Sequence, residues 1–229
     1  MRGLAMAFRP RTLTSMAEKP HKRRDRYDVS GNIEAQYADE AQTVLVNKLG
    51  ITELDVLHAA EEQALARAYG QLLREVHTDT PMTCDLLRHI HAAIFGDLYD
   101  WAGRWRTAWI SKPGITWPPP DFLDKSMDEY QQTTLSRWPA SAIRDDATFC
   151  QAAGEIQGEF LTIHPFREGN ARAIKLLTDL LAAQTGRPLL AYDNTPSGAD
   201  AYIEAAKQAF KRDHSALIKL IALALERSR

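Results

Sequence analysis

The spacing of apolar residues along this chain is mainly that of amphipathic helices. From residue 52 onward, apolar residues recur at intervals of three and four, and glycines, prolines and capping residues separate the runs. The strongest pattern follows a capping-box sequence, Thr52-Glu53-Leu54-Asp55. Its apolar stripe consists of Leu54, Leu57, Leu65, Tyr69, Leu72 and Val76. Taken together, the patterns predict about eight helices in a single, mainly α domain.

Capping and breaking residues set the expected bounds of the other helices. A helix that contains Val44, Leu45 and Leu49 is expected to stop at Gly50. The residues expected to open helices are Thr83, Asp121 and the capping box Ser197-Gly198-Ala199-Asp200. Further helices are expected over 146–163, 171–184 and 217–225.

The segment between residues 96 and 117 departs from the helical pattern and is dense in aromatic residues and glycines. Two short strand-like runs, 107–111 and 115–117, flank Pro113-Gly114, a dipeptide suited to a type II turn. We therefore expect one β-hairpin. It is either a surface loop or a ledge that pairs with an extended segment of a partner, and the pattern alone favours neither.

Composition and charge narrow the class of protein. The chain has 229 residues, of which 45% are hydrophobic and 25% charged, and its net charge of -2 does not favour a nucleic-acid partner. Residues 1–26 lack periodicity and carry a basic cluster, so we expect a solvated, disordered tail. No run approaches the roughly 20 apolar residues of a membrane span. The expected location is the cytoplasm, and a secreted effector is left open.

The two cysteines and a pair of nearby histidines do not predict a metal site. Cys84 and Cys150 lie in predicted helices beside apolar residues and are expected to be reduced, buried thiols. His89 and His91 are two residues apart on one helix and point to different faces, which makes a shared metal unfavourable. We expect solvent or structural roles for both.

The chemistry is concentrated in the stretch His164-Pro165-Phe166-Arg167-Glu168-Gly169-Asn170-Ala171-Arg172. An imidazole can accept a proton near neutral pH, although a histidine before a proline is also a common structural cap. Glu168 is a hard oxygen ligand of the kind that shares magnesium with substrate phosphates. The following turn and helix N-terminus favour anions, whereas Arg172 opposes the helix dipole unless an anion is bound. These parts suit a phosphate-bearing substrate attacked by a hydroxyl.

This stretch resembles the signature of the Fic (Fic/Doc) family, His-x-Phe-x-Asp/Glu-Gly-Asn-Gly-Arg-x-x-Arg. The upstream segment 95–103, with Arg106-Thr107 and Ile110-Ser111-Lys112, resembles the family's approach to its flap hairpin. The resemblance covers roughly residues 45–225 and implies a Fic fold for the domain 27–229. It also implies a protein AMP transferase that uses ATP and Mg²⁺ and modifies a Ser, Thr or Tyr hydroxyl of a target protein.

The resemblance also implies a role for each residue of the site. His164 would be the general base, Glu168 would hold the magnesium, and Phe166 would fix the loop in the core. The residues implied to bind the nucleotide phosphates are Gly169, Asn170, Ala171, Arg172 and Lys175. The flap residues implied to align the target are Ile110, Ser111, Lys112 and Gly114.

Two positions depart from the family signature. Ala171 replaces a glycine, and its Cβ would be unfavourable if the backbone needs a positive φ or a phosphate comes close. Lys175 replaces the second arginine and lacks its bidentate fork. Transfer of phosphate or of another nucleotide, or a Fic-fold binding module without catalysis, therefore remain alternatives.

Regulation is the last expectation from sequence. Residues 30–35 resemble the family's inhibitory pattern Ser/Thr-x-x-x-Glu-Gly/Asn except at Ala35, which implies that Glu34 pairs with Lys175. The alternative is that this segment only leads into the first helix. The identity of the target, restraint by a small antitoxin and a toxin or effector role are left open.

Overall fold

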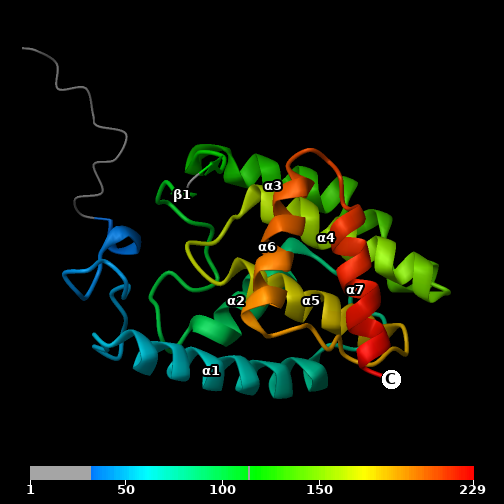
Figure 1. Ribbon diagram of the computed structural model, residues 1–229, viewed down its shortest axis with the longest axis horizontal. Helices are drawn as coiled ribbons and strands as arrows, with labels where there is room; N and C mark the ends of the chain where they lie inside the picture. The colour runs from blue at the N-terminus through cyan, green and yellow to red at the C-terminus, as the bar shows by residue number, and fades with distance from the viewer. Residues whose placement is uncertain (1–31, 113) are drawn as a thin grey trace, which may run out of the picture.

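The computed structural model describes residues 32–112 and 114–229, which contain seven α-helices and one short hairpin (Figure 1). The helices are α1 Leu54–Glu75, α2 Cys84–Phe95, α3 Leu123–Thr133, α4 Asp146–Ile163, α5 Asn170–Gln184, α6 Pro196–Ala209 and α7 Ser215–Arg227. The mainly α fold is confirmed, with seven α-helices in the described part of the chain instead of about eight. The predicted tail 1–26, with Ser30 and Gly31, lies outside the described residues.

Helices α4 and α5 form the centre of the core. Helix α4 contacts α3, α5, α6 and α7, and α5 also contacts α1 and α2. Both are buried on most of their faces, as expected for helices with apolar residues all round. In Figure 1, α1 runs along one side of the molecule and α3 along the opposite side. The turn between α4 and α5 carries the His164 stretch, so the core fixes both of its ends.

Only one of the predicted helix N-caps is confirmed. The Thr83 hydroxyl accepts a hydrogen bond from the Leu86 amide at 3.1 Å. The other expected caps, Thr52, Asp121 and Ser197, are wrong. The residues before α1, α3 and α6 are Glu53, Phe122 and Thr195. At α6, a Thr-Pro pair supplies both the capping oxygen and the preferred first helical residue, and it displaces the capping box that begins at Ser197.

The helix expected to end at Gly50 is also wrong. Residues 36–46 form bends and a turn, with an isolated bridge between Tyr37 and Leu45. The Asp39 carboxylate accepts hydrogen bonds from the amides of Thr43 and Val44, at 2.9 and 2.7 Å. A local side-chain acceptor of this kind competes with helix formation, and three apolar residues were too few to define a period.

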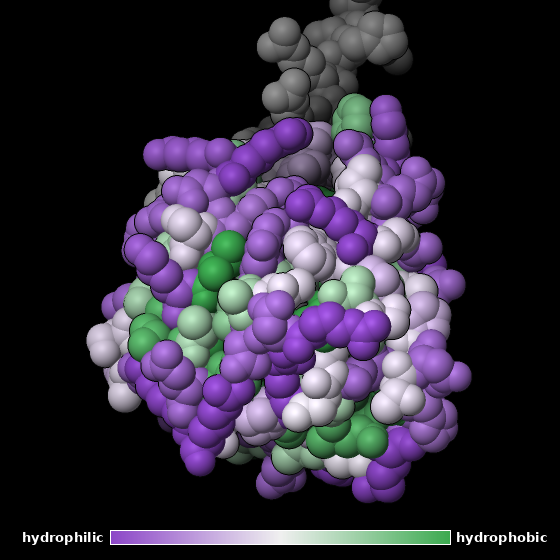
Figure 2. Space-filling model, turned by 90° about the vertical axis from the view of Figure 1, so that its right-hand side faces the viewer, coloured by the Kyte–Doolittle hydropathy of each residue, from purple (hydrophilic) through white to green (hydrophobic). Residues whose placement is uncertain are grey.

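The hairpin is present but shorter than predicted. Strands β1 Ser111–Lys112 and β2 Ile115–Thr116 pair antiparallel, with Ser111 opposite Thr116. Gly114 has a φ of +80°, as the expected turn requires. Away from the hairpin, the face shown in Figure 2 is mostly hydrophilic, and its hydrophobic residues form small separate patches. Among the described residues, no helix has the length and apolar character needed to cross a membrane.

Candidate active site

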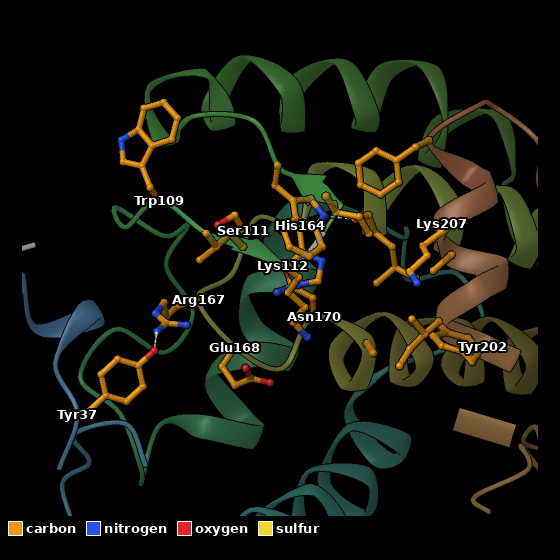
Figure 3. Close-up of a pocket in the computed structure, with 18 residues that line it drawn as sticks. Tyr37, Trp109, Ser111, Lys112, His164, Arg167, Glu168, Asn170, Tyr202 and Lys207 are labelled. Carbon is orange, nitrogen blue, oxygen red and sulfur yellow. Dashed lines mark hydrogen bonds between the residues drawn. The ribbon is translucent and has the colours of Figure 1, made fainter. Parts of the chain in front are cut away.

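A cavity of about 820 Å³ lies over the turn between α4 and α5 (Figure 3). The hairpin forms one wall and α6 forms another, and Tyr37 contributes from the N-terminal segment. The predicted site residues that line it are Ile110, Ser111, Lys112, His164, Glu168, Asn170 and Ala171. The fold therefore brings the hairpin and the His164 stretch to one cavity. Gly114, Arg172 and Lys175 do not line it.

His164 ends α4 in a left-handed conformation, with φ 52° and ψ 59°. A non-glycine residue pays a conformational penalty there, and such strain is concentrated at functional sites. Its Nδ1 atom is buried and has no hydrogen-bond partner among the described residues. Burial is the main cause that lowers the pKa of His164 to about 4, against the opposing effects of the Leu161 carbonyl and Glu168. The imidazole is thus neutral at physiological pH, and one nitrogen of a neutral imidazole can accept a proton.

Two buried residues that sequence analysis did not assign to the site hold His164 in place. The Arg106 guanidinium donates to the carbonyls of His164 at 2.9 Å, Ala108 at 2.9 Å and Pro118 at 2.7 Å. The Trp117 ring lies 4.3 Å from the imidazole centroid, and its Nε1–H donates to the Leu161 carbonyl. Both residues flank the hairpin. The position of Arg106 close to the predicted hairpin was the one signal in the sequence that could have indicated this role.

His91 contacts the turn between α4 and α5 through Phe166 and Glu168, so the expected structural role is confirmed. Its Nδ1 accepts the Gly103 amide at 2.9 Å, which leaves Nε2–H to donate to the Glu168 carbonyl at 3.0 Å. Its ring stacks on Phe166, which is fully buried, at 3.8 Å between centroids. Burial lowers the pKa of His91 to about 4, consistent with the neutral tautomer that these bonds require. His89, in contrast, is exposed and bonds Glu75 at 3.1 Å.

Glu168 is the acidic residue in the turn, and about half of its side chain is exposed. Desolvation raises its pKa, but the Gly169 amide and the cations Arg172, Lys112 and Arg167 together lower it below the ordinary value. Oε1 accepts the Gly169 amide at 3.0 Å, which leaves Oε2 available. Among residues 32–112 and 114–229, no three His, Cys, Asp or Glu side chains are grouped to hold a metal. One free carboxylate oxygen fits a magnesium ion held mainly by substrate phosphates.

Gly169 starts α5 in a conformation that only glycine adopts easily, with φ +78°. A Cβ at this position would overlap the Phe95 ring. Asn170, the next residue, is buried and joins both polar groups of its side chain to the Phe166 backbone, at 2.9 and 2.8 Å. The Asn170 side chain therefore closes the loop, and one of the two N–H groups of its amide is used in doing so.

Arg172 has an anionic partner inside the protein. Its Nη1 lies 2.7 Å from Oε2 of Glu61, a residue of α1 that is buried and also accepts from the Tyr99 hydroxyl. Nη2 lies 3.5 Å from Glu168. These carboxylates offset the dipole penalty that the sequence indicated. Glu61 could not be recognised from sequence because it lies 111 residues away.

The two departures from the family signature have different consequences. Ala171 is in α5 and is not among the residues with positive φ, so its Cβ causes no backbone strain, although it lines the cavity. The Lys175 ammonium lies between the rings of Tyr192 and Tyr202, 4.3 and 4.1 Å from their centroids. Burial lowers the pKa of Lys175, and Asp179 opposes this effect. Lys175 is therefore held against these two rings and does not line the cavity.

The expected pairing of Glu34 with Lys175 does not occur in this structure. Glu34 is buried, and its carboxylate accepts hydrogen bonds from the amides of Thr107 and Ala108, whereas Lys175 contacts the two tyrosines. The short pattern at 30–35 could not indicate this, because Thr107 and Ala108 lie more than 70 residues away.

Comparison with known proteins identifies the fold. A sequence profile of the Fic/DOC family matches residues 81–182. The crystal structure of BepC, a VirB-translocated effector protein with bound AMPPNP from Bartonella tribocorum, is 18% identical in sequence. It superposes with a TM-score of 0.70 and covers 84% of this chain and 97% of that one. At this identity the match concerns the fold alone, and it confirms the Fic fold that the resemblance implied.

Curated relatives carry the name protein adenylyltransferase. VbhT of Bartonella schoenbuchensis is 31% identical over 150 residues, which cover 66% of this chain and 31% of that protein. The Fic protein adenylyltransferase of Nematostella vectensis is 26% identical over 194 residues, covering 82% of this chain and 43% of that protein. The chain thus spans less than half of the length of these two relatives. The match over residues 81–182, together with the shared fold, identifies a Fic/DOC domain in this chain.

Proposed function

We propose that this chain is a protein adenylyltransferase that moves AMP from ATP to a hydroxyl side chain of a target protein. The observation that carries the proposal is the neutral His164 imidazole, which lines the same cavity as Asn170 and Ala171 at the N-terminus of α5. The names of the relatives and the AMPPNP bound to BepC support a nucleotide as the donor.

In this mechanism His164 accepts the proton of the target hydroxyl. The hydroxyl oxygen then bonds to the α-phosphorus, the bond from that phosphorus to the bridging oxygen of the β-phosphate breaks, and pyrophosphate leaves. The first intrahelical bond of α5 runs from the Ala173 amide to the Gly169 carbonyl, so the amides of residues 170–172 precede the helical ladder. These amides and the helix dipole stabilise negative charge at the phosphates.

Glu168 is the residue that would hold Mg²⁺, and the ion would neutralise charge on the α- and β-phosphates when bound with ATP. Lys112, on the hairpin, lines the same cavity and is a cation that lowers the pKa values of both Glu168 and His164. The flap would therefore contribute a cation to the binding of the incoming phosphates.

The hairpin would align the target beside His164. Ile110, Ser111 and Lys112 line the cavity, and Ser111 and Lys112 are exposed. A two-stranded sheet has unpaired edges that can bind an extended segment by strand addition. The hydroxyl of such a segment would then lie close to the imidazole, which is the proximity that phosphoryl-group chemistry needs.

A second candidate is a Fic-fold docking module without transfer activity. It is favoured by the fact that Arg172 and Lys175, both implied to bind phosphate, contact Glu61 and two tyrosines instead.

Incubation of the purified chain with a cell lysate and either α-labelled or γ-labelled ATP separates these readings. Lysate without the chain gives the background of its own enzymes. Label above that background from α-labelled ATP alone supports AMP transfer, and label above it from γ-labelled ATP indicates phosphate transfer. No label above background from either nucleotide supports the docking module.

A further inference from the structure

Glu34 is a buried acid that holds the start of the flap. Its Oε2 accepts hydrogen bonds from the Thr107 amide at 2.6 Å and the Ala108 amide at 3.0 Å. The Asn32 side chain donates to the Thr107 hydroxyl at 3.1 Å. Residues 32–34 are thereby fixed to the backbone that leads into β1. Hydrogen bonds to a carboxylate are among the stronger ones in proteins.

The same segment is joined to the catalytic turn. The Glu34 carbonyl accepts a hydrogen bond from Nε of Arg167, a residue between Phe166 and Glu168. Nη2 of Arg167 donates to the Tyr37 hydroxyl at 3.2 Å, a contact visible in Figure 3. The Glu34 side chain therefore binds the start of the flap, and the Glu34 backbone binds the turn between α4 and α5.

Charges of both signs hold residues 106–108. The Glu34 carboxylate binds the amides of Thr107 and Ala108, and the Arg106 guanidinium binds the Ala108 carbonyl at 2.9 Å. Burial lowers the pKa of Arg106 to about 10, and the nearby Glu34 opposes that shift. Among the ion pairs of residues 32–112 and 114–229, none involves Glu34. Its charge is stabilised mainly by the flap backbone.

We propose that Glu34 is a positioning residue that fixes the flap over the cavity and supports transfer. Removal of an inhibitory glutamate would raise transfer activity. Removal of Glu34 is expected to lower it. The effect on transfer rests on the proposed function, whereas the effect on the flap backbone does not.

The experiment uses the full chain and three variants, Glu34→Ala, Glu34→Gln and Glu40→Ala. Glu40 is an exposed acid in the same segment and controls for the loss of one negative charge. Hydrogen exchange measured by mass spectrometry follows the amides of Thr107 and Ala108, with α5 as the internal reference. Steady-state transfer from α-labelled ATP to the best-labelled lysate protein gives KM for the target and for ATP separately.

In Glu34→Ala we expect exchange at 107–108 to accelerate about tenfold or more, with α5 unchanged. Target KM should rise about tenfold because the flap is misplaced, with little change in ATP KM. Glu34→Gln keeps an acceptor oxygen and should lie between wild type and Glu34→Ala, and Glu40→Ala should match wild type. Faster transfer by Glu34→Ala, or unchanged exchange at 107–108, would overturn the inference. If the wild type transfers no label, the proposed function fails and the exchange measurement still decides the role of Glu34.

Discussion

The Arg106 guanidinium donates from Nε to the backbone carbonyl of His164 at 2.9 Å. The Arg106 amide also donates to the Pro165 carbonyl at 2.8 Å. Through these bonds the start of the flap and the expected general base form one hydrogen-bonded unit. A movement of the hairpin is therefore transmitted to the residue that has the unusual left-handed backbone.

Replacing Arg106 with lysine should destabilise the protein and slow transfer. A lysine has no planar fork, so at least one of the carbonyls of His164, Ala108 and Pro118 loses its partner in a buried position. We expect a loss of about 1–3 kcal/mol in the free energy of unfolding. Urea denaturation measures it. Arg104→Lys, at an exposed position two residues away, is the matched control and should stay within about 0.5 kcal/mol of wild type.

Gly169→Ala should lower the free energy of unfolding more than Gly186→Ala, although both glycines have a positive φ. Both Gly169 and Gly186 have positive φ, at +78° and +73°, but only a Cβ at 169 meets the Phe95 ring. The backbone penalty is about 1–2 kcal/mol at each site, and overpacking adds about 1–3 kcal/mol at Gly169. Thermal and urea unfolding of the two variants measure this difference. Equal losses would show that the packing of Phe95 against the turn does not constrain position 169.

The ion pair of Arg172 and Glu61 should show strong coupling. Arg172→Gln leaves Glu61 buried without its cation, whereas the double variant with Glu61→Gln removes both charges. A double-mutant cycle of unfolding free energies should give about 1–3 kcal/mol of coupling. The exposed pair of Lys207 and Glu204 should give less than about 1 kcal/mol. Coupling at Arg172 no larger than at Lys207 would contradict the structural role assigned to Glu61.

Stability should fall as the pH is lowered from 7 to 5. Burial lowers the pKa values of both His91 and His164 to about 4, below their ordinary value of 6.5. Between these values the unfolded chain binds protons that the native chain excludes, so acid favours unfolding by about 2 kcal/mol per histidine. Urea denaturation across this range tests the prediction. His164→Asn should reduce the pH dependence by about half, and an unchanged pH dependence in this variant would contradict the prediction.

Sequence reasoning identified the stretch 164–172, the hairpin and the mainly helical fold, because each has a local signature. The base, the acid and the Gly-Asn turn of the site are contiguous in sequence. The helices are recognised by the spacing of their apolar residues at intervals of three and four. The helix at 44–50 failed because the Asp39 side chain competes with helical hydrogen bonds, an effect that periodicity does not include.

The contacts that hold the site could not be predicted because they join distant parts of the chain. Arg106 reaches His164 across 58 residues, and Glu61 reaches Arg172 across 111. The expected roles of Asn170 and Lys175 followed from the family signature, whereas their side-chain directions depend on Phe166 and on the two tyrosines. The sequence therefore indicated that these residues belong to the site, but it did not indicate which partner each side chain contacts.

The most direct test of the central claim is AMP transfer from α-labelled ATP by wild type, His164→Ala and His89→Ala. His89 lies on the surface of α2 and controls for the loss of an imidazole. If His164 is the base, the His164→Ala variant should bind ATP normally but transfer AMP at least about a hundredfold more slowly. His89→Ala should match wild type. Full transfer of the α-label by His164→Ala would contradict the account.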